Sequence, residues 1–251
     1  MLRAAFRPVP RRTSLNCFLV HAGGRVALID TGAGSHMQKS SGKLLQNMAA
    51  AGVAPDAIDT VLLTHMHPDH SNGLATADGG AFFPKAELAM HAAERDYWTS
   101  AEAEAEVARS GQGVPTGGAY FPMAKRQMAP YLDRLKLFQG GAEVFPGVTA
   151  VHFPGHTPGH CGYLIASGDQ SLLIWGDIVH LPEVQVPRPE VTIAFDVDPA
   201  QAAATRRRVF DMVATDRTHV AGMHLHFPAT GHVAREGGTY RLYPEAWNQV
   251  I

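Results

Sequence analysis

The stretch Thr64-His65-Met66-His67-Pro68-Asp69-His70 decides the fold of this 251-residue chain, because it places three imidazoles and a carboxylate within six positions. Neutral imidazole is the commonest protein ligand for zinc-like ions, and a neighbouring carboxylate supplies negative charge. In an extended segment His65 and His67 point to the same side and can hold one ion. Asp69 and His70 diverge, so at least one of them can reach a second ion. The cluster predicts half of a metal site, with a histidine-rich surface loop as the alternative.

The composition is that of an ordinary globular protein, with 45% hydrophobic and 18% charged residues. A net charge of −2 leaves no basic field that would attract phosphates, so we expect no nucleic-acid partner. No apolar run is long enough to span a bilayer, and we expect no membrane partner. Residues 1–12 contain four arginines and no apolar segment, so cytoplasm is the default location, with a trimmed export signal left open. Because no linker is evident, we expect one domain over residues 1–251.

Strands and helices are predicted along both halves of the chain. Expected strands cover residues 26–30, 61–63, 87–91, 148–153, 162–166, 171–175 and 219–223. Expected helices cover residues 43–51, 92–110, 123–138 and 199–213, and a Gly- and Pro-rich surface loop is expected at 111–122. Strands precede helices in both halves, with hairpin-like pairs between them. The class is therefore α/β, with mixed sheets covered by helices.

Further ligand-type residues stand where predicted strands end. His156, Asp177 and His224 each follow an apolar run, and His156 lies in a turn of prolines and glycines. Ligands of α/β folds gather in the crevice beyond the carboxyl ends of strands. A carboxylate at such a buried end also needs a counter-charge. Any one of these residues alone would more often be a hydrogen-bonded structural residue. With the first cluster, however, they make seven candidate ligands, which is enough for two ions.

The two cysteines, Cys17 and Cys161, are too few for a disulfide framework. We expect both to be buried apolar residues. Cys161 lies close in sequence to His156 and His160, so a role as a metal ligand is the alternative for its thiolate.

Four motifs follow one another along the chain: His65-Met66-His67-Pro68-Asp69-His70, Gly155-His156-Thr157-Pro158-Gly159-His160, Gly176-Asp177 and His224. Their order and spacing resemble the metallo-β-lactamase-fold hydrolase superfamily over residues 16–235. Asp30-Thr31-Gly32 resembles the first motif of that superfamily, in which the aspartate braces the metal-binding loop. The resemblance implies a four-layer αβ/βα sandwich, with two mixed sheets flanked by helices.

The resemblance also implies a ligand set for two divalent metal ions. One ion would be held by His65, His67 and His156. The other would be held by Asp69, His70 and His224, with Asp177 bridging the two and His160 as an outer partner that orients the ligands. Zinc is the expected metal, with manganese, cobalt or iron as alternatives. Two such ions about 3.5–4 Å apart share a water whose pKa falls toward neutrality, which gives a bridging hydroxide as nucleophile. Asp69 is in addition a candidate catalytic residue that takes or delivers a proton as the leaving group departs.

Residues 191–196 and 224–233 resemble the branch that contains methyl parathion hydrolase and N-acyl-homoserine lactonases. The expected function is a dinuclear metal-dependent hydrolase that opens a lactone of the N-acyl-homoserine-lactone type. An organophosphate triester or other ester hydrolase at the same site is the alternative. A glyoxalase II-like thioesterase and a redox diiron protein are further alternatives. Lactonases of this branch place a tyrosine three residues after the bridging aspartate, and this chain has His180 there. His180 is therefore the second candidate catalytic residue, which either donates a hydrogen bond to the substrate or faces solvent.

Two weaker expectations concern surfaces. Candidate walls of the substrate pocket are Phe82, Phe195, Leu225 and Phe227, with ordinary core packing as the alternative for each. Exposed loops around Trp98 and Met123 would support a homodimer.

Overall fold

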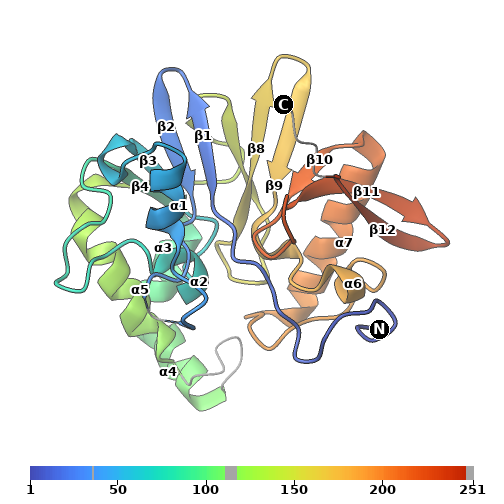
Figure 1. Ribbon diagram of the computed structural model, residues 1–251. Helices are drawn as coiled ribbons and strands as arrows, with labels where there is room; N and C mark the ends of the chain where they lie inside the picture. The colour runs from blue at the N-terminus through green and yellow to red at the C-terminus, as the bar shows by residue number, and fades with distance from the viewer. Residues whose placement is uncertain (36, 111–117, 247–251) are drawn as a thin grey trace.

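The computed structural model describes residues 1–35, 37–110 and 118–246, and its strands form two sheets (Figure 1). The first sheet has, in spatial order, β1 (Phe18–Ala22), β2 (Arg25–Ile29), β3 (Thr60–Leu62), β4 (Glu87–His91) and β5 (Leu135–Phe138). The second has β12 (Thr239–Pro244), β11 (Thr230–Glu236), β10 (His219–Ala221), β9 (Gln170–Ile174), β8 (Cys161–Ser167), β7 (Val148–His152) and β6 (Glu143–Phe145). Both sheets are mixed, since β2 to β5 are parallel and β1 is antiparallel, while β9 and β10 form the one parallel pair of the second sheet.

Helices cover the outer faces of the two sheets. The first-half helices are α1 (Leu44–Ala50), α2 (Pro68–Ser71), α3 (Ala92–Thr99), α4 (Ala101–Ser110) and α5 (Tyr120–Met128), with 3₁₀ turns η1 (Pro55–Ala57) and η2 (Ala129–Arg134). The second half has the 3₁₀ turn η3 (Gly176–Ile178), α6 (Pro182–Gln185) and α7 (Pro199–Asp216). Figure 1 shows the first-half helices on one side, α7 on the other and the sheets between them. The expected four-layer αβ/βα sandwich is confirmed.

The two sheets pack face to face through fully buried apolar side chains. Ala27, Ile29 and Leu62 come from the first sheet, and Tyr163 and Ile174 from the second. Of these strands, β3 leads into the loop of His65 to His70, β9 leads to Asp177, and β8 begins where the loop of His156 ends. Since β2 and β3 are parallel, as are β9 and β10, the carboxyl ends of each pair lie at the same edge of its sheet. The core therefore fixes the positions from which the ligand loops start.

Helix α7 is the main support of the second sheet. Its start is set by Asp198, whose side chain accepts a hydrogen bond from the Gln201 backbone N–H, and by a proline at the first helical position. Its buried face carries Val209, Phe210 and Val213. The Phe210 ring lies 6.0 Å from the ring of Trp175 at the end of β9. This packing holds α7 against the strand that precedes Asp177.

The predicted helix over residues 123–138 is wrong at both ends. Helix α5 begins earlier, at Tyr120, and ends at Met128, followed by a 3₁₀ turn and then β5. Pro130 lacks a backbone N–H and its ring clashes with the preceding helical turn, which ends the α-helix. Leu135–Phe138 is instead hydrogen-bonded to β4 as a parallel edge strand. The first residues of the predicted loop, 111–117, lie outside the described residues.

Trp98 is fully buried in the core of the first half, so the expectation of an exposed loop around it is wrong. Met123 lies on α5 and is 36% exposed. Within the described ranges, none of the helices is at once long and apolar enough to cross a bilayer. One domain over residues 1–251 and a homodimer stay predictions.

We predict that Phe210→Ala lowers the free energy of unfolding by about 3–5 kcal/mol, because it removes a fully buried ring and leaves a cavity. Urea unfolding of the metal-free protein measures this change. Leu132→Ala is the matched control, since this side chain is 65% exposed and should cost less than about 0.5 kcal/mol. A similar loss in both variants would contradict the packing described for α7.

Candidate metal centre

The loop after β3 presents its side chains from a braced backbone. Asp30 lies at the end of β2 with a positive φ of 57°, and its carboxylate faces the loop. Its Oδ1 accepts a hydrogen bond from the Thr64 backbone N–H at 2.8 Å, and its Oδ2 accepts one from the Thr64 hydroxyl at 2.7 Å. Oδ2 also lies 2.7 Å from Nδ1 of His70. Asp30 therefore holds both ends of the loop, as a brace of that loop must.

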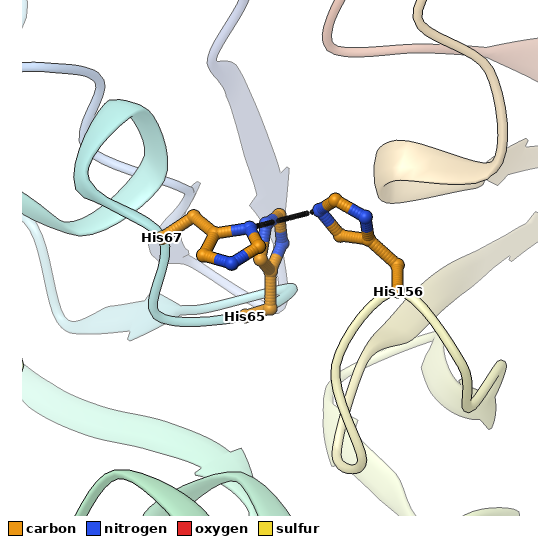
Figure 2. A group of neighbouring side chains, drawn as sticks. All are labelled: His65, His67 and His156. Carbon is orange, nitrogen blue, oxygen red and sulfur yellow. Dashed lines mark hydrogen bonds between the residues drawn. The ribbon is translucent and has the colours of Figure 1, made fainter. Parts of the chain in front are cut away.

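Three imidazoles from two loops converge on one point (Figure 2). Nδ1 of His67 lies 3.1 Å from Nε2 of His65 and 2.9 Å from Nε2 of His156, and the two Nε2 atoms are 3.2 Å apart. Each ring nitrogen either carries a proton or presents a lone pair, so among three nitrogens in mutual contact two must be alike and repel. A cation at the common point removes this conflict, because all three nitrogens then present lone pairs to it. The three residues fit one metal ion.

A second group lies beside the first. Nε2 of His70 and Nε2 of His224 lie 3.5 and 3.6 Å from Oδ2 of Asp69. The same two nitrogens lie 3.2 Å from Oδ2 of Asp177, which is also 3.3 Å from Nε2 of His156 in the first group. Asp177 thus lies between the two groups, and its Oδ1 is a buried atom without a hydrogen-bond partner in the described part of the chain. All seven sequence-predicted ligands are brought together, and their ligand atoms are spaced to hold metal ions.

Outer hydrogen bonds set which nitrogen of the His156, His224 and His70 rings faces the centre. Nδ1 of His156 lies 2.8 Å from Oδ1 of Asp196, and Nδ1 of His224 donates to the Ser14 carbonyl at 2.9 Å. When Nδ1 carries the proton, Nε2 presents its lone pair to the centre. The pairing of His70 with the Asp30 carboxylate does the same for that ring. These three rings are therefore oriented for metal binding in the metal-free chain, whereas Nε2 of His67 has no hydrogen-bond partner among the described residues.

The centre favours an anionic Asp177 and unprotonated rings at His65 and His67, whereas at His156 burial is outweighed by the carboxylates of Asp177 and Asp196, which raise the pKa of that ring to about 9. Burial, followed by the charge of neighbouring histidines, holds the pKa of His65 and of His67 well below the ordinary value. Burial alone would raise the pKa of Asp177, but the surrounding imidazoles of His224 and His70 hold it well below its usual range. An ionised carboxylate beside unprotonated imidazoles is the donor set that divalent zinc-like ions prefer.

His160 lies outside the ligand groups and holds one ligand in place. Its Nδ1 donates to the Phe153 carbonyl at 2.8 Å, and its Nε2 accepts from the Asp177 backbone N–H at 2.9 Å. Gly176 is required here, since its φ is 59° and a Cβ would lie 2.4 Å from Nε2 of His160. Burial lowers the pKa of His160 to about 3, so the ring stays neutral and keeps this donor and acceptor pattern.

His180 points into the centre and not into solvent. Its Nε2 lies 2.8 Å from Oδ2 of Asp177, and its ring stacks on that of His224 with centroids 4.8 Å apart. The side chain is 13% exposed, more than the 5% of His224, so it lies toward the open side of the centre. Burial lowers the pKa of His180 to about 4 and keeps the ring neutral, although Asp177 opposes this effect.

Three aromatic rings lie near the ring of His67. The rings of Trp98, Tyr120 and Phe195 lie 5.6, 6.0 and 6.4 Å from its ring. Phe195, one of the expected pocket walls, is 40% exposed and its ring contacts that of the candidate ligand His67. Leu225 is instead buried in the core under α7, and Phe227 is 72% exposed.

The fourth expected wall, Phe82, is half-buried and packs against the core of the first half. Cys161 is also a core residue: its Sγ lies 3.6 Å from the Leu63 and Thr64 carbonyl oxygens, and burial raises the pKa of its thiol. Cys161 belongs to none of the candidate ligand groups among the described residues. Cys17 is only half-buried.

The sequence did not reveal Glu94, which links the two loops of the first group. Its Oε1 accepts hydrogen bonds from the Met66 backbone N–H at 2.8 Å and from the Trp98 indole at 2.6 Å. Its Oε2 accepts from the Thr157 hydroxyl at 2.6 Å and from the Gly159 backbone N–H at 3.1 Å. Because residues 92–110 contain several glutamates, no local signal distinguishes this one from those on the helix surface.

Comparison with known proteins agrees with this geometry. A family model described as the metallo-beta-lactamase superfamily matches residues 11–224. The crystal structure of the hydrolase AbOPH in the beta-lactamase superfamily has a TM-score of 0.92 at 34% identity, covering 99% of this chain and 86% of that one. AidC, a dizinc quorum-quenching lactonase in complex with the product N-hexanoyl-L-homoserine, has a TM-score of 0.91 at 24% identity, covering 99% and 85%.

Two curated relatives match shorter segments. An N-acyl homoserine lactonase from a Bacillus species is 28% identical over 123 residues, which is 49% of this chain and 39% of that protein. A ribonuclease Z from Mycobacterium avium is 42% identical over 67 residues, 27% of this chain and 20% of that protein. The chain therefore spans 20% to 39% of the length of these curated relatives.

We predict that the metal-free protein loses stability as the pH falls below about 6.5. The unfolded chain protonates its histidines there, whereas His160, with a pKa of about 3, stays unprotonated in the folded protein. Each such histidine lowers the free energy of unfolding by roughly 1.4 kcal/mol per pH unit below 6.5. Urea unfolding between pH 6.5 and 5 in the presence of a chelator measures the slope. His160→Gln should reduce this slope, and an unchanged slope would contradict the burial of a neutral ring.

Proposed function

Because the chain belongs to the metallo-beta-lactamase superfamily, we propose that it is a dinuclear metal-dependent hydrolase that opens a lactone of the N-acyl-homoserine-lactone type. The observation that carries the proposal is the position of Asp177, whose Oδ2 lies within 3.3 Å of a candidate ligand nitrogen in each of the two groups. A hydrolase that attacks a neutral carbonyl needs an activated water and a stabilised oxyanion at neighbouring points. Two adjacent cation sites that share one carboxylate meet this need.

In this proposal His65, His67 and His156 hold one ion, Asp69, His70 and His224 hold the other, and Asp177 contacts both. When bound, two divalent ions supply an activated water as nucleophile and a Lewis acid for the electrophile. Zinc is the proposed metal, since the donor set is rich in imidazole.

Asp69 and His180 are the proposed catalytic residues. Asp69 is the most open ligand, with 22% of its side chain exposed, and the charges of His70 and His224 lower its pKa against the effect of burial. It is therefore ionised, and can take the proton released by the attacking water and return it to the ring oxygen of the lactone as the C–O bond breaks. The neutral His180 ring carries one N–H, which faces Oδ2 of Asp177 in this structure. When Asp177 binds the ions instead, this N–H can donate to the carbonyl oxygen as that oxygen gains negative charge.

The surroundings favour a small neutral substrate. The partly exposed rings of Tyr120 and Phe195 beside His67 provide an apolar surface for an acyl chain. The same rings suit the aryl group of a phosphotriester, which makes an organophosphate triester hydrolase the second candidate. The matches to ribonuclease Z are short, and a net charge of −2 does not favour a polyanion such as RNA. A cytoplasmic location stays a prediction.

We predict that the zinc-loaded protein hydrolyses N-hexanoyl-homoserine lactone with a kcat/KM at least about 100-fold above that for an aryl phosphotriester, a difference of about 2.8 kcal/mol in transition-state stabilisation. Titration of the released proton measures hydrolysis of the lactone, and the amount of released aryl alcohol measures hydrolysis of the phosphotriester. Asp177→Ala should lower the bound metal and both activities together, since it removes the carboxylate shared by the two groups. Activity on the phosphotriester alone would reject the lactonase proposal, and full activity of Asp177→Ala would reject the site.

We predict that His180→Ala lowers kcat for the lactone by about 10- to 1000-fold while two ions stay bound, because it removes a donor to the developing oxyanion. Metal analysis and steady-state kinetics on the same preparation measure both quantities. His226→Ala is the matched control, since this histidine lies two residues beyond a ligand but makes no contact with Asp177 among the described interactions. A His180→Ala variant with unchanged kcat would show that the ring is not catalytic.

A further inference from the structure

Arg206 on α7 is a fully buried guanidinium that no part of the proposed mechanism uses. The residue is 1% exposed. Its Nε donates to the Ile178 carbonyl at 2.6 Å, and its Nη1 donates to the carbonyls of Pro189 and Val191 at 2.8 and 2.9 Å. These bonds satisfy part of the group, but a buried positive charge is costly unless an anion lies close to it.

The anion is the carboxylate of Asp196. Its Oδ2 lies 4.0 Å from Nη2 of Arg206, and it too is fully buried. Oδ2 also accepts a hydrogen bond from the Ile193 backbone N–H at 3.0 Å, while Oδ1 lies 2.8 Å from Nδ1 of His156. The carboxylate therefore stands between the guanidinium and the imidazole, with a separate oxygen directed to each.

The backbone around Asp196 is fixed to the loop that carries His156. The Val197 N–H donates to the His156 carbonyl at 3.0 Å, and the Asp198 N–H donates to the Gly155 carbonyl at 2.9 Å. Asp198 is the residue that caps α7, so Asp196 and Arg206 are held by the start and the second turn of one helix. Gly155 has no room for a side chain, because a Cβ would lie 2.3 Å from the Ala202 backbone nitrogen. The helix, the carboxylate and the loop form one rigid unit.

We propose that Asp196 and Arg206 position His156 for metal binding. Asp196 keeps the proton of the ring on Nδ1 and fixes the direction of Nε2, and Arg206 holds the carboxylate in place and links it to the segment after Asp177. Both are positioning residues, since among the described interactions His156 is the one candidate ligand that this pair contacts. The inference rests on the proposed function, which makes His156 a ligand. If Arg206 only held residues 178–191 in place, its replacement would not weaken the binding of one ion more than that of the other.

Asp196→Asn is the decisive variant. In the wild-type protein the Asp196 carboxylate accepts from two N–H groups, those of His156 and Ile193, through different oxygens. An asparagine has one oxygen, so its amide NH₂ must face one of these two donors. Either the ring loses its partner and its proton moves to Nε2, or the loop at Ile193 is disturbed. We expect a 10- to 100-fold weaker affinity for one of the two ions, which is the usual effect of losing an outer partner of a ligating histidine.

The test is a titration of the metal-free protein with Zn²⁺ in competition with a chromophoric chelator, which resolves the two binding steps. Arg206→Met should weaken the same step as Asp196→Asn, and Arg206→Lys should weaken it less. Arg207→Met is the matched control, because its side chain is on the exposed face of the same helix and should leave both steps unchanged. At a pH above the His156 pKa of about 9, the ¹⁵N resonances of the imidazoles in the zinc-free protein report the His156 tautomer, which should shift in Asp196→Asn.

His156→Ala is the reference for loss of one ion. If it binds two ions as tightly as the wild type, the proposed function fails. If it loses one ion but Asp196→Asn binds both with unchanged affinity, the positioning proposal fails and the function stands. Equal weakening of both steps in Asp196→Asn, with a lower free energy of unfolding, would also overturn the proposal. Should Arg206→Met not fold, Asp196→Asn and Arg206→Lys decide the question.

Discussion

The centre depends on one buried oxygen atom, Oδ2 of Asp177. It lies between 2.8 and 3.6 Å from imidazole nitrogens of five residues, namely His180, His70, His224, His156 and His65. A carboxylate oxygen has two lone pairs and cannot accept hydrogen bonds from five donors. Where the outer bonds leave Nε2 with a lone pair, that lone pair faces an anion and is repelled by it. Cations between these atoms turn the same arrangement into coordination, and the rest of the structure holds the atoms in place for them.

Buried carboxylates from different parts of the chain hold the ligand loops in place. Asp30 at the end of β2 holds the first loop, Glu94 on α3 joins it to the loop of His156, and Asp196 before α7 orients that ring. Each carboxylate is almost completely buried and lies within hydrogen-bond distance of N–H or O–H groups of at least two residues. A lost acceptor would leave a buried donor unpaired, which costs about 1–3 kcal/mol. The loops of the centre are therefore set by the fold, although loops of this length are mobile in many proteins.

The sequence predicted the gathering of the candidate ligands better than the residues that support them, and the reason is local. Histidines at a fixed spacing after an apolar run stand out along the chain, so the gathering of His65, His156 and His224 at one edge followed from where strands end. Glu94 and Arg206 give no such signal, because a glutamate or an arginine on a helix is ordinarily exposed and its burial depends on distant segments. The helix predicted at 123–138 failed for a related reason: apolar spacing cannot show whether Leu135–Phe138 continues a helix or pairs with β4. The local sequence pattern identifies candidate ligands, whereas contacts between distant segments determine which charged side chains are buried.

An array of converging ring nitrogens and buried carboxylates is not the most stable arrangement for the metal-free chain. The fold tolerates it because the sheet-to-sheet core and α7 supply apolar burial independent of the centre. Metal binding then adds stability, since an ion that binds the folded chain and not the unfolded one shifts the equilibrium by mass action. The repulsion between lone pairs destabilises the metal-free centre. Because the same lone pairs point toward common positions, an ion could bind there without rearrangement of the ligands. The buried outer carboxylates thus fix the candidate ligands in positions where they could bind a cation without further ordering of the loops.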